Sequence, residues 1–449
     1  MEINAGDTAW VMVSAALVML MTPGLALFYG GMVRAKSVLN MIMMSFLALG
    51  IVTIIWLTYG YSLAFGKDAG GGLIGGLEFA GLRNTLDAVT GGEGNEIPLL
   101  AFVMFQMTFA IITCALLSGA VADRIRTRAW VVLVIAWTTL VYIPIAHWAF
   151  AFQDGSGGWI GDRLGALDFA GGTAVEINSG FSSLALAIVV GARIGFRREP
   201  MRPHNLPLVL LGAGLLWFGW FGFNAGSALS AGHLAATAMI NTQIATAAAS
   251  LTWVVAERLR DGKATTLGIA SGAISGAVAI TPSCGFVTPM GALAIGLAAG
   301  AICALAVGIK YRLGYDDSLD VLGVHGVGGL VGMIGIGVLA TTAVNDAGAD
   351  GLLAGGGLDL LGKQSLAAVA TMAYAFTATW VIAKVVDRVV GFRVAPDAEI
   401  AGIDLSEHAE SAYEFTDASA GSGAFAGIGS ASLSQYLKHG SDRDRSGQE

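Results

Sequence analysis

The chain has 449 residues, of which 55% are hydrophobic and only 12% are charged, and its formal net charge is −8. A soluble domain of this length needs a more highly charged surface, so the composition excludes an ordinary soluble protein and favours an integral membrane protein. The sequence contains no Walker loop, dinucleotide fingerprint, HExxH, nucleophile elbow or cysteine metal spacing, so we expect no enzyme, cofactor or metal. The basic residues are dispersed, so we expect no nucleic-acid partner.

Eleven apolar runs are long enough to cross a lipid bilayer, since a spanning helix needs roughly 20 mainly apolar residues. The predicted spans are 8–31, 38–66, 98–122, 129–150, 169–192, 205–228, 236–256, 266–285, 290–310, 318–343 and 365–390. The span near 266–285 is the weakest, because the segment TPSCGF interrupts it. The pattern predicts an all-α integral membrane protein.

Arginine and lysine are concentrated in every second loop, beginning with the loop after the first span. The intervening loops are longer in total but hold only Lys67, Arg83, Arg163 and Lys363. Cytoplasmic loops of membrane proteins carry an excess of Lys and Arg. We therefore expect a multi-pass protein of the cytoplasmic (inner) membrane, with its N-terminus outside and its C-terminus in the cytoplasm.

The composition changes near the end of the last span. We assign residues 1–394 to a transmembrane domain and residues 395–415, which are acidic and polar, to a cytoplasmic segment that could fold against it. Residues 416–449 are rich in Ser, Gly and Ala, and this composition predicts a disordered cytoplasmic tail.

The fifth and tenth spans share a sequence pattern. DFAGGTAVEINSG (168–180) and DVLGVHGVGG (320–329) each begin with Asp at the membrane edge and continue through small residues to Val and an ionisable side chain. The two spans enter the membrane from opposite sides. The pattern predicts two inverted five-helix repeats followed by a final long helix, an arrangement typical of transporters with a site at the midplane.

Glu176 and His325 are the ionisable residues at matching points of this repeat. An ionisable group in the middle of a membrane is unfavourable by at least a few kcal/mol, so it is expected to face a cavity or a partner. The alternative is a hydrogen-bonded pair that only joins the two spans. Asp168 and Asp320 lie near helix starts, and we favour N-capping over substrate contact as their role.

Aromatic residues are dense on the third, fourth and sixth spans, and most are explained by interfacial belts or packing. A cluster of aromatic rings beside a hydroxyl such as Ser227 would also suit a small cation, through cation–π contacts and a hydrogen-bond acceptor. The residues concerned are Phe105, Phe109, Trp148, Phe150, Trp217, Trp220, Phe221 and Phe223.

These segments closely resemble the ammonium transporter family (Amt/Mep/Rh), and its bacterial Amt branch in particular. The resemblance covers about residues 7–415. It is carried by TPGLALFYGGMVRAKSVLN (22–40), FQMTFAIIT (105–113), ADRIRTRAW (122–130), IPIAHW (143–148), DFAGGTAVEIN (168–178), WFGWFGFNAGS (217–227), YDDSLDVLGVHGVGG (315–329) and VGFRVAPDAEIAGIDLSEHAESAY (390–413).

The resemblance implies a homotrimer in which each subunit encloses a narrow apolar pore for ammonium or ammonia. Phe109 and Phe223 match the family's stacked gate, Ser227 with Phe105 matches its outer recruitment site, and His325 matches its second pore histidine. The resemblance also implies that the tail 390–413 docks a cytoplasmic PII-type regulator, and that Asp168 is structurally required.

The chain departs from the family pattern at two positions. Glu176 replaces the first pore histidine, a change that some fungal members share. The usual position of the recruitment-site tryptophan holds Phe150, and Trp148 lies nearby, so either ring is a candidate for the outer site.

We expect ammonium to lose its proton near the gate, with ammonia descending the pore and the proton passing separately through Glu176 and His325. The alternatives are electroneutral conduction of ammonia and an ammonium sensor that acts mainly through protein docking.

Overall fold

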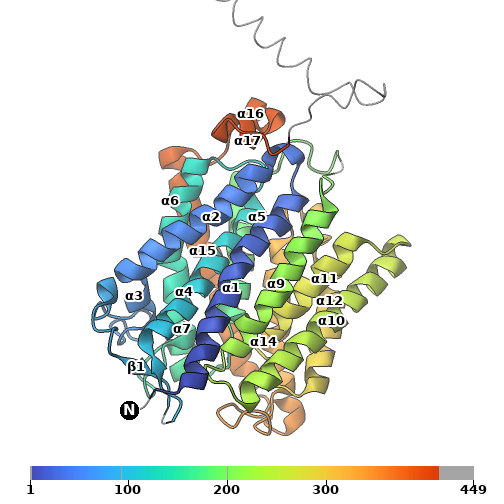
Figure 1. Cartoon of the computed structure of the whole chain (residues 1–449). Helices are drawn as coiled ribbons and strands as arrows, with labels where there is room; N and C mark the ends of the chain where they lie inside the picture. Colours follow the sequence, from blue (N-terminus) through green and yellow to red (C-terminus); the bar gives the residue numbers. More distant parts are fainter. Residues whose placement is uncertain (1–2, 93, 200, 414–449) are drawn as a thin grey trace, which may run out of the picture. The chain divides into compact units, whose positions relative to one another are not determined.

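The computed structural model describes residues 3–92, 94–199 and 201–413, and nearly all its regular structure is helical (Figure 1). Residues up to Glu410 form one unit, and the few described residues after it belong to another. The predicted disordered tail 416–449 lies outside the described residues. The helices are α1 Ala5–Met32, α2 Val38–Ile55, α3 Tyr61–Phe65, α4 Leu99–Leu116, α5 Ser118–Val121, α6 Thr127–Trp137, α7 Ile143–Phe150, α8 Asn178–Val190, α9 Leu206–Gly226, α10 His233–Asp261, α11 Thr266–Ile280, α12 Pro289–Ala306, α13 Ile309–Leu313, α14 Val327–Leu339, α15 Asp359–Val390, α16 Pro396–Ala401 and α17 Ile403–His408.

Among the described residues, five π-helical turns interrupt or extend these helices: Trp56–Gly60, Thr138–Tyr142, Trp159–Arg163, Gly172–Ile177 and Leu322–Gly326. Several predicted spans are therefore built from consecutive helical pieces, such as α8 with the turn before it. The strands in the described chain are only two residues long, with β1 (Val89–Thr90) antiparallel to β2 (Ile97–Pro98).

Helices occupy all eleven predicted ranges of the described chain, which confirms an all-helical, multi-span fold. Nine helical stretches among the described residues are both long and apolar enough to cross a membrane. The two remaining ranges hold α10 and α11. The hydropathy of α10 is lower because it contains many Ala, Thr, Asn and Gln residues, and α11 is shorter, with 15 residues. As the TPSCGF segment suggested, α11 ends at Ile280 and a non-helical stretch follows it.

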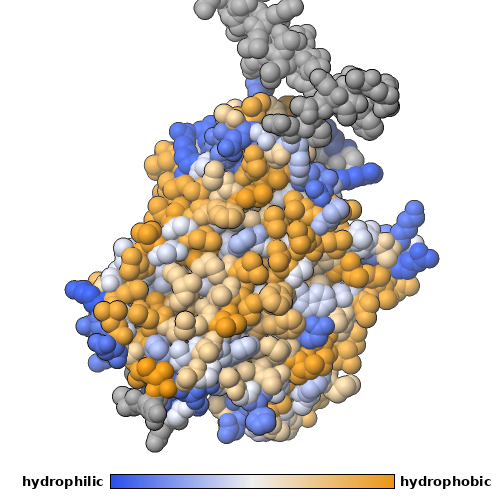
Figure 2. All heavy atoms as spheres, in the orientation of Figure 1, coloured by the Kyte–Doolittle hydropathy of each residue, from blue (hydrophilic) through white to orange (hydrophobic). Residues whose placement is uncertain are grey.

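Glycine allows the long helices to pack backbone against backbone. A Cβ added to Gly212 on α9 would lie 2.3 Å from the backbone nitrogen of Phe28 on α1. Apolar helices gain no hydrophobic driving force by associating in lipid, so such close van der Waals packing holds them together. Figure 2 shows hydrophobic residues over the middle of the visible face, with hydrophilic residues gathered toward its two ends.

One end of the helical unit, which we call the basic end, carries α16 and α17 (Figure 1). The loops after α1, α5 and α8 contact the segment after α15 there. The backbone N–H groups of Leu39 and Asn40 donate to the Asp404 carboxylate at 3.0 and 2.8 Å. Glu399 accepts from the N–H of Ile194 at 2.7 Å and pairs with Arg393 at 2.7 Å. The segment after α15 therefore joins loops from both halves of the sequence.

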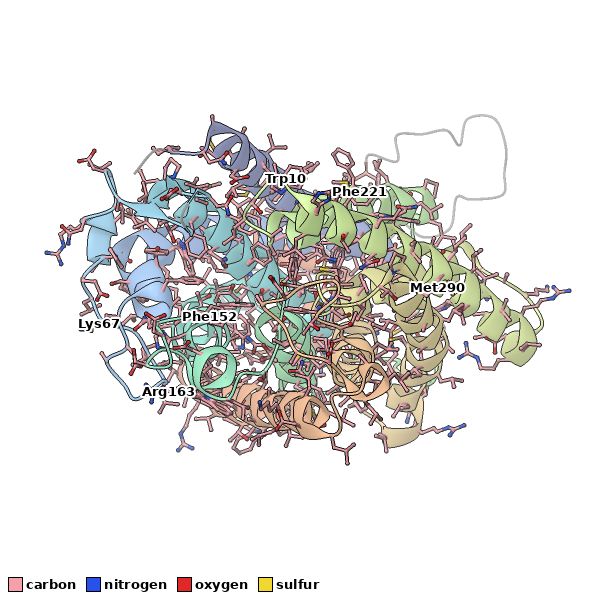
Figure 3. All side chains as sticks on the ribbon, turned by 90° about the horizontal axis from the view of Figure 1, so that it is seen from below. Trp10, Lys67, Phe152, Arg163, Phe221 and Met290 are labelled. Atoms are coloured by element: carbon pink, nitrogen blue, oxygen red, sulfur yellow. The ribbon has the colours of Figure 1, made fainter. Side chains whose placement is uncertain are left out.

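The opposite end is formed by longer loops, which Figure 3 views directly. The ring of His147 on α7 lies 2.9 Å from the carbonyl oxygen of Ala64 and 3.2 Å from Asp68. Asp68 also pairs with Arg163 at 3.0 Å. This arrangement fixes the loops after α3 and α7 to each other, and Lys67, Phe152 and Arg163 lie among them in Figure 3.

Candidate functional site

Glu176 and His325 meet in the interior of the helical unit. Each is on a π-helical turn, Gly172–Ile177 for Glu176 and Leu322–Gly326 for His325. Their side chains are only 1% and 4% exposed, respectively, and Nδ1 of His325 lies 2.7 Å from Oε2 of Glu176. The two ionisable residues singled out in the sequence are therefore direct partners.

The close approach of the two π-helical turns depends on glycine. A Cβ on Gly180 would lie 2.2 Å from the Cα of Gly326, and one on Gly329 would lie 2.9 Å from the Cβ of Glu176. Small residues at these positions let the two backbones come near enough for the Glu176 and His325 side chains to touch.

Asp168 holds the start of the first π-helical turn. Its carboxylate accepts from the backbone N–H groups of Gly171, Gly172 and Thr173 at 2.7–2.8 Å, and from the Thr173 hydroxyl. These are the hydrogen bonds expected of an N-capping carboxylate, which satisfies the free N–H groups of a helix start.

The predicted capping role of Asp320 is wrong, because its neighbour Asp317 performs it. The carboxylate of Asp317 accepts from the N–H of Leu322 at 2.7 Å. Asp320 has a left-handed backbone, with φ of 64°, and its carboxylate lies 2.7 Å from Nζ of Lys310. The Asp320 carboxylate is thus directed to Lys310 and not to the free N–H groups at the start of the turn.

Sequence reasoning overlooked Asp317, although a spacing signal was available. Asp168 and Asp317 each precede the ionisable residue of their turn, Glu176 or His325, by eight positions. Aligning the two segments on this spacing, rather than on Asp320, would have identified the second capping carboxylate.

A narrow cavity touches the Glu176–His325 pair and runs between α1, α4, α9 and α11. Its free volume is about 10 Å³, close to what one water-sized molecule requires. Apart from the ionisable pair its walls are apolar and aromatic: Met21, Leu25, Phe28, Ile112, Leu116, Val175, Leu216, Trp220, Phe223 and Ile274. A small neutral molecule suits such a cavity, whereas a bare ion would lose its hydration there without replacement.

The predicted gate residues lie together at one end of this cavity. The rings of Phe109 and Phe223 are 4.3 Å apart between centroids, and Phe105 lies 4.9 Å from Phe109. Phe223 also lines the cavity. Ser227 lies four residues after Phe223, at the C-terminal end of α9. Its side chain is half-buried, and its hydroxyl donates to the carbonyl oxygen of Phe223 at 2.8 Å.

The two aromatic candidates on α7 have different surroundings. The indole N–H of Trp148 donates to the carbonyl oxygen of Leu73 at 2.9 Å, and its ring packs against Tyr374 and Trp159. None of these partners belongs to the predicted outer site. Phe150 is half-buried at the last position of α7, two residues farther along.

No group of three or more His, Cys, Asp or Glu side chains is arranged to hold a metal ion among the residues with described positions. The site thus consists of a paired carboxylate and imidazole, an apolar cavity of molecular width, and aromatic rings at its end. On an all-helical, multi-span fold, these features are typical of a membrane transporter or channel.

The chain belongs to the Ammonium Transporter Family, whose pattern matches residues 9–413. It is 53% identical to the ammonium transporter of Mycobacterium tuberculosis over 437 residues, covering 93% of this chain and 92% of the relative. The ammonium transporter of Bacillus subtilis is 48% identical over 410 residues, with 91% and 98% covered. The family and its bacterial branch are therefore as the quoted segments indicated.

Solved structures share the same fold. Saccharomyces cerevisiae Mep2 aligns with a TM-score of 0.80 at 35% identity, covering 88% of this chain and 89% of that protein. A protein described as a Sensor Amt Protein aligns with a TM-score of 0.81 at 29% identity, covering 90% and 98%. The chain is thus a multi-pass membrane protein with the Amt/Mep fold.

Proposed function

We propose that this protein moves ammonium across the cytoplasmic membrane electrogenically, carrying ammonia and a proton by separate routes. The observation that carries the proposal is the 2.7 Å contact between Glu176 and His325 beside an apolar cavity of molecular width. The relatives named as ammonium transporters supply the substrate. The cavity and the ionisable pair supply the separation of the neutral molecule from its proton.

In this mechanism ammonium first rests at an outer site made by Ser227, Phe105, Phe109 and Phe150. Aromatic faces and a hydroxyl oxygen replace part of the hydration shell of the cation. We prefer Phe150 to Trp148 there, because the indole N–H and the ring of Trp148 already have partners in the loop after α3 and on α15. Phenylalanine attracts a cation less strongly than tryptophan, so this site binds weakly.

Deprotonation near the Phe109–Phe223 gate then releases ammonia into the cavity. A neutral molecule crosses an apolar passage without the desolvation penalty that an ion meets. The proton passes to Glu176 and His325, which share one proton between them, because the attraction between an ionised Glu176 and a protonated His325 is opposed by their burial. The pair then releases the proton on the cytoplasmic side, so one positive charge crosses the membrane with each ammonia molecule.

The sequence features support further parts of this proposal. The excess of Lys and Arg at the basic end supports its placement in the cytoplasm. The family resemblance supports a homotrimer and a PII-type regulator that docks on the tail 390–413. Asp168 serves as a structural cap, and Asp320 pairs with Lys310 just before the turn that carries His325.

The test is the current evoked by an ammonium jump across proteoliposomes that contain the purified protein. We expect a saturable current that is absent from protein-free vesicles. Glu176→Gln keeps the size and hydrogen-bonding capacity of the side chain but cannot carry the charge. It should lower the current at least about tenfold, equivalent to about 1.4 kcal/mol in the barrier, with little change in thermal unfolding.

The matched control is Glu410→Gln, which makes the same change at an exposed position of the basic end. It should leave the current unchanged. Normal current from a well-folded Glu176→Gln variant would exclude the proton relay. Ammonia flux without current would favour an electroneutral channel, and the absence of both from folded protein would favour a sensor, as the similarity to the Sensor Amt Protein suggests.

A further inference from the structure

A second, larger crevice lies between α8, α13 and the turn Leu322–Gly326. It is lined by Leu322 and Gly323 of this turn, but not by Glu176 or His325. Its volume is about 530 Å³. Aliphatic side chains form most of its walls, among them Leu184 and Ile188 from α8, Ile309 and Leu313 from α13, and Leu322. It belongs to neither the pore cavity nor the gate.

This crevice opens onto the part of the surface that faces lipid in a membrane protein. Ile188 is 49% exposed and Leu313 is 73% exposed, and both belong to helical stretches that are long and apolar enough to cross the membrane. A water-filled apolar crevice of this size at a lipid-facing position is unfavourable, so apolar chains are expected to fill it.

The mouth of the crevice at the basic end carries positive charge. A guanidinium nitrogen of Arg197 lies 3.4 Å from the position that a Cβ on Gly314 would occupy, and Gly314 lines the crevice. Arg198 and Arg312 are exposed nearby in the sequence. Within the described chain, none of these three arginines forms an ion pair.

The acidic residue in the crevice wall does not cancel this charge. Asp316 is fully buried and is occupied by Arg193, whose Nε and NH2 atoms lie 2.9 Å from its two carboxylate oxygens. The mouth is therefore left with the exposed Arg197 beside an apolar crevice, whose walls include the exposed Ile188 and Leu313.

We infer that this crevice binds one anionic phospholipid, with an acyl chain between α8 and α13 and the phosphate on Arg197. A guanidinium matches a phosphate with two parallel hydrogen bonds. Basic pockets between membrane helices at the positively charged side select anionic head groups. A zwitterionic head group would place its own cation among the arginines, which disfavours it. This site goes beyond the proposed transport function and does not depend on it.

The experiment is native mass spectrometry of the purified full chain in detergent, titrated separately with phosphatidylglycerol and phosphatidylcholine of identical acyl chains. Phosphatidylglycerol should bind more tightly. Arg197→Gln should weaken its binding about fivefold, which corresponds to about 1 kcal/mol for one arginine near a charged surface. The control Arg258→Gln removes the same charge at the end of α10 and should bind like the wild type.

The apolar part of the site needs a separate variant. Ile188→Trp places a larger ring in the crevice and should remove the bound lipid, whereas Ile302→Trp, at an exposed position of α12 outside the crevice lining, should not. Soluble glycerol phosphate should fail to compete, because it lacks the acyl chain. Equal binding of the two lipids, or binding unchanged in both Arg197→Gln and Ile188→Trp, would overturn the proposal in favour of another occupant, such as a second copy of the chain.

Discussion

Two carboxylates, Asp168 and Asp317, fix the starts of the two π-helical turns that carry Glu176 and His325. They differ in their surroundings. Asp168 accepts four hydrogen bonds from its own turn, whereas Asp317 lies in a cluster with Lys310 and Asp320. Burial raises the pKa of Asp317 to about 6, although Lys310 opposes the shift. This residue therefore titrates in an accessible pH range.

The raised pKa of Asp317 predicts a specific dependence of stability on pH. The folded state binds this proton more tightly than the unfolded chain does. The contribution of Asp317 to the unfolding free energy is therefore largest below about pH 4 and is lost as the pH rises through about 6, by at most about 3 kcal/mol. Asp317→Asn keeps a capping oxygen but cannot titrate. We expect it to abolish this part of the slope in thermal unfolding measured from pH 4 to 7.

Other buried carboxylates also contribute to the pH profile, so the informative quantity is the difference between the wild type and the variant. Asp397→Asn, at an exposed position of α16, is the control and should keep the wild-type slope. A slope that survives unchanged in Asp317→Asn would show that the carboxylate has an ordinary pKa.

At the scale of helices, the decisive feature is the contact between α8 and the turn that carries His325. Gly180 leaves no room for a side chain, since a Cβ there would lie 2.2 and 2.3 Å from two backbone atoms of Gly326. Backbone atoms cannot rotate away as a flexible side chain can. Any side chain at position 180 must therefore move the two helical segments apart.

Gly180→Ala should separate the Glu176–His325 pair as well as destabilise the fold. We expect a loss of about 1–3 kcal/mol in unfolding free energy from overpacking, and a larger relative loss of ammonium current. Unfolding in detergent and proteoliposome currents measure the two effects. Gly214→Ala on α9 is the matched control, because nothing lies within 4 Å of an added Cβ there. Wild-type current from Gly180→Ala would argue against a requirement for this contact.

A second element-scale prediction concerns α2, whose start lacks a capping side chain of its own. Asp404 from α17 supplies the cap by accepting from the N–H groups of Leu39 and Asn40. Asp404→Ala should destabilise this helix start locally by about 0.5–2 kcal/mol. Faster hydrogen exchange of the amides of residues 39 and 40 would measure it.

The exposed Asp397 serves again as a control, since Asp397→Ala removes a carboxylate from the same segment without removing the cap. Unchanged exchange at residues 39 and 40 in Asp404→Ala would mean that the contact between α17 and α2 contributes nothing to the helix start.

Sequence reasoning succeeded where a single strong physical constraint acts. Unpaired charge is excluded from lipid, so Glu176 and His325 stood out as partners, and the long apolar runs identified the spans. It was wrong about Asp320 and left the choice between Trp148 and Phe150 open, because local geometry decides both. Asp317 caps the turn in place of Asp320, whose backbone is left-handed. Trp148 faces the loop after α3, because its indole N–H donates to the carbonyl oxygen of Leu73 in that loop.

At the scale of the whole molecule, topology rests on α10 and α11, the pair that falls short of the length or hydropathy of a typical span. Their mutual packing and contacts with α12 compensate, because glycines such as Gly272, Gly276 and Gly296 bring the three backbones together. A helix shielded by its neighbours needs fewer apolar side chains than one that faces lipid on all sides. We therefore expect both helices to cross the membrane.

Cysteine labelling can separate eleven crossings from nine. The three native cysteines are all fully buried, so the background reaction with a membrane-impermeant maleimide is low. Single cysteines would replace the exposed residues Asp87, Arg128 and Lys263. With eleven crossings and the basic end inside, Asp87→Cys reacts in intact spheroplasts, whereas Arg128→Cys and Lys263→Cys react only after permeabilisation.

If α10 and α11 did not cross, Lys263 would lie on the same side as Asp87, and Lys263→Cys would react in intact spheroplasts while Arg128→Cys would not. If the orientation were inverted, Arg128→Cys would react and Asp87→Cys would not. Each of the three topologies thus gives its own labelling pattern. We expect the first pattern, because the basic residues at Arg258, Arg260 and Lys263 continue the alternation set by the earlier loops, and a nine-crossing chain would place them outside.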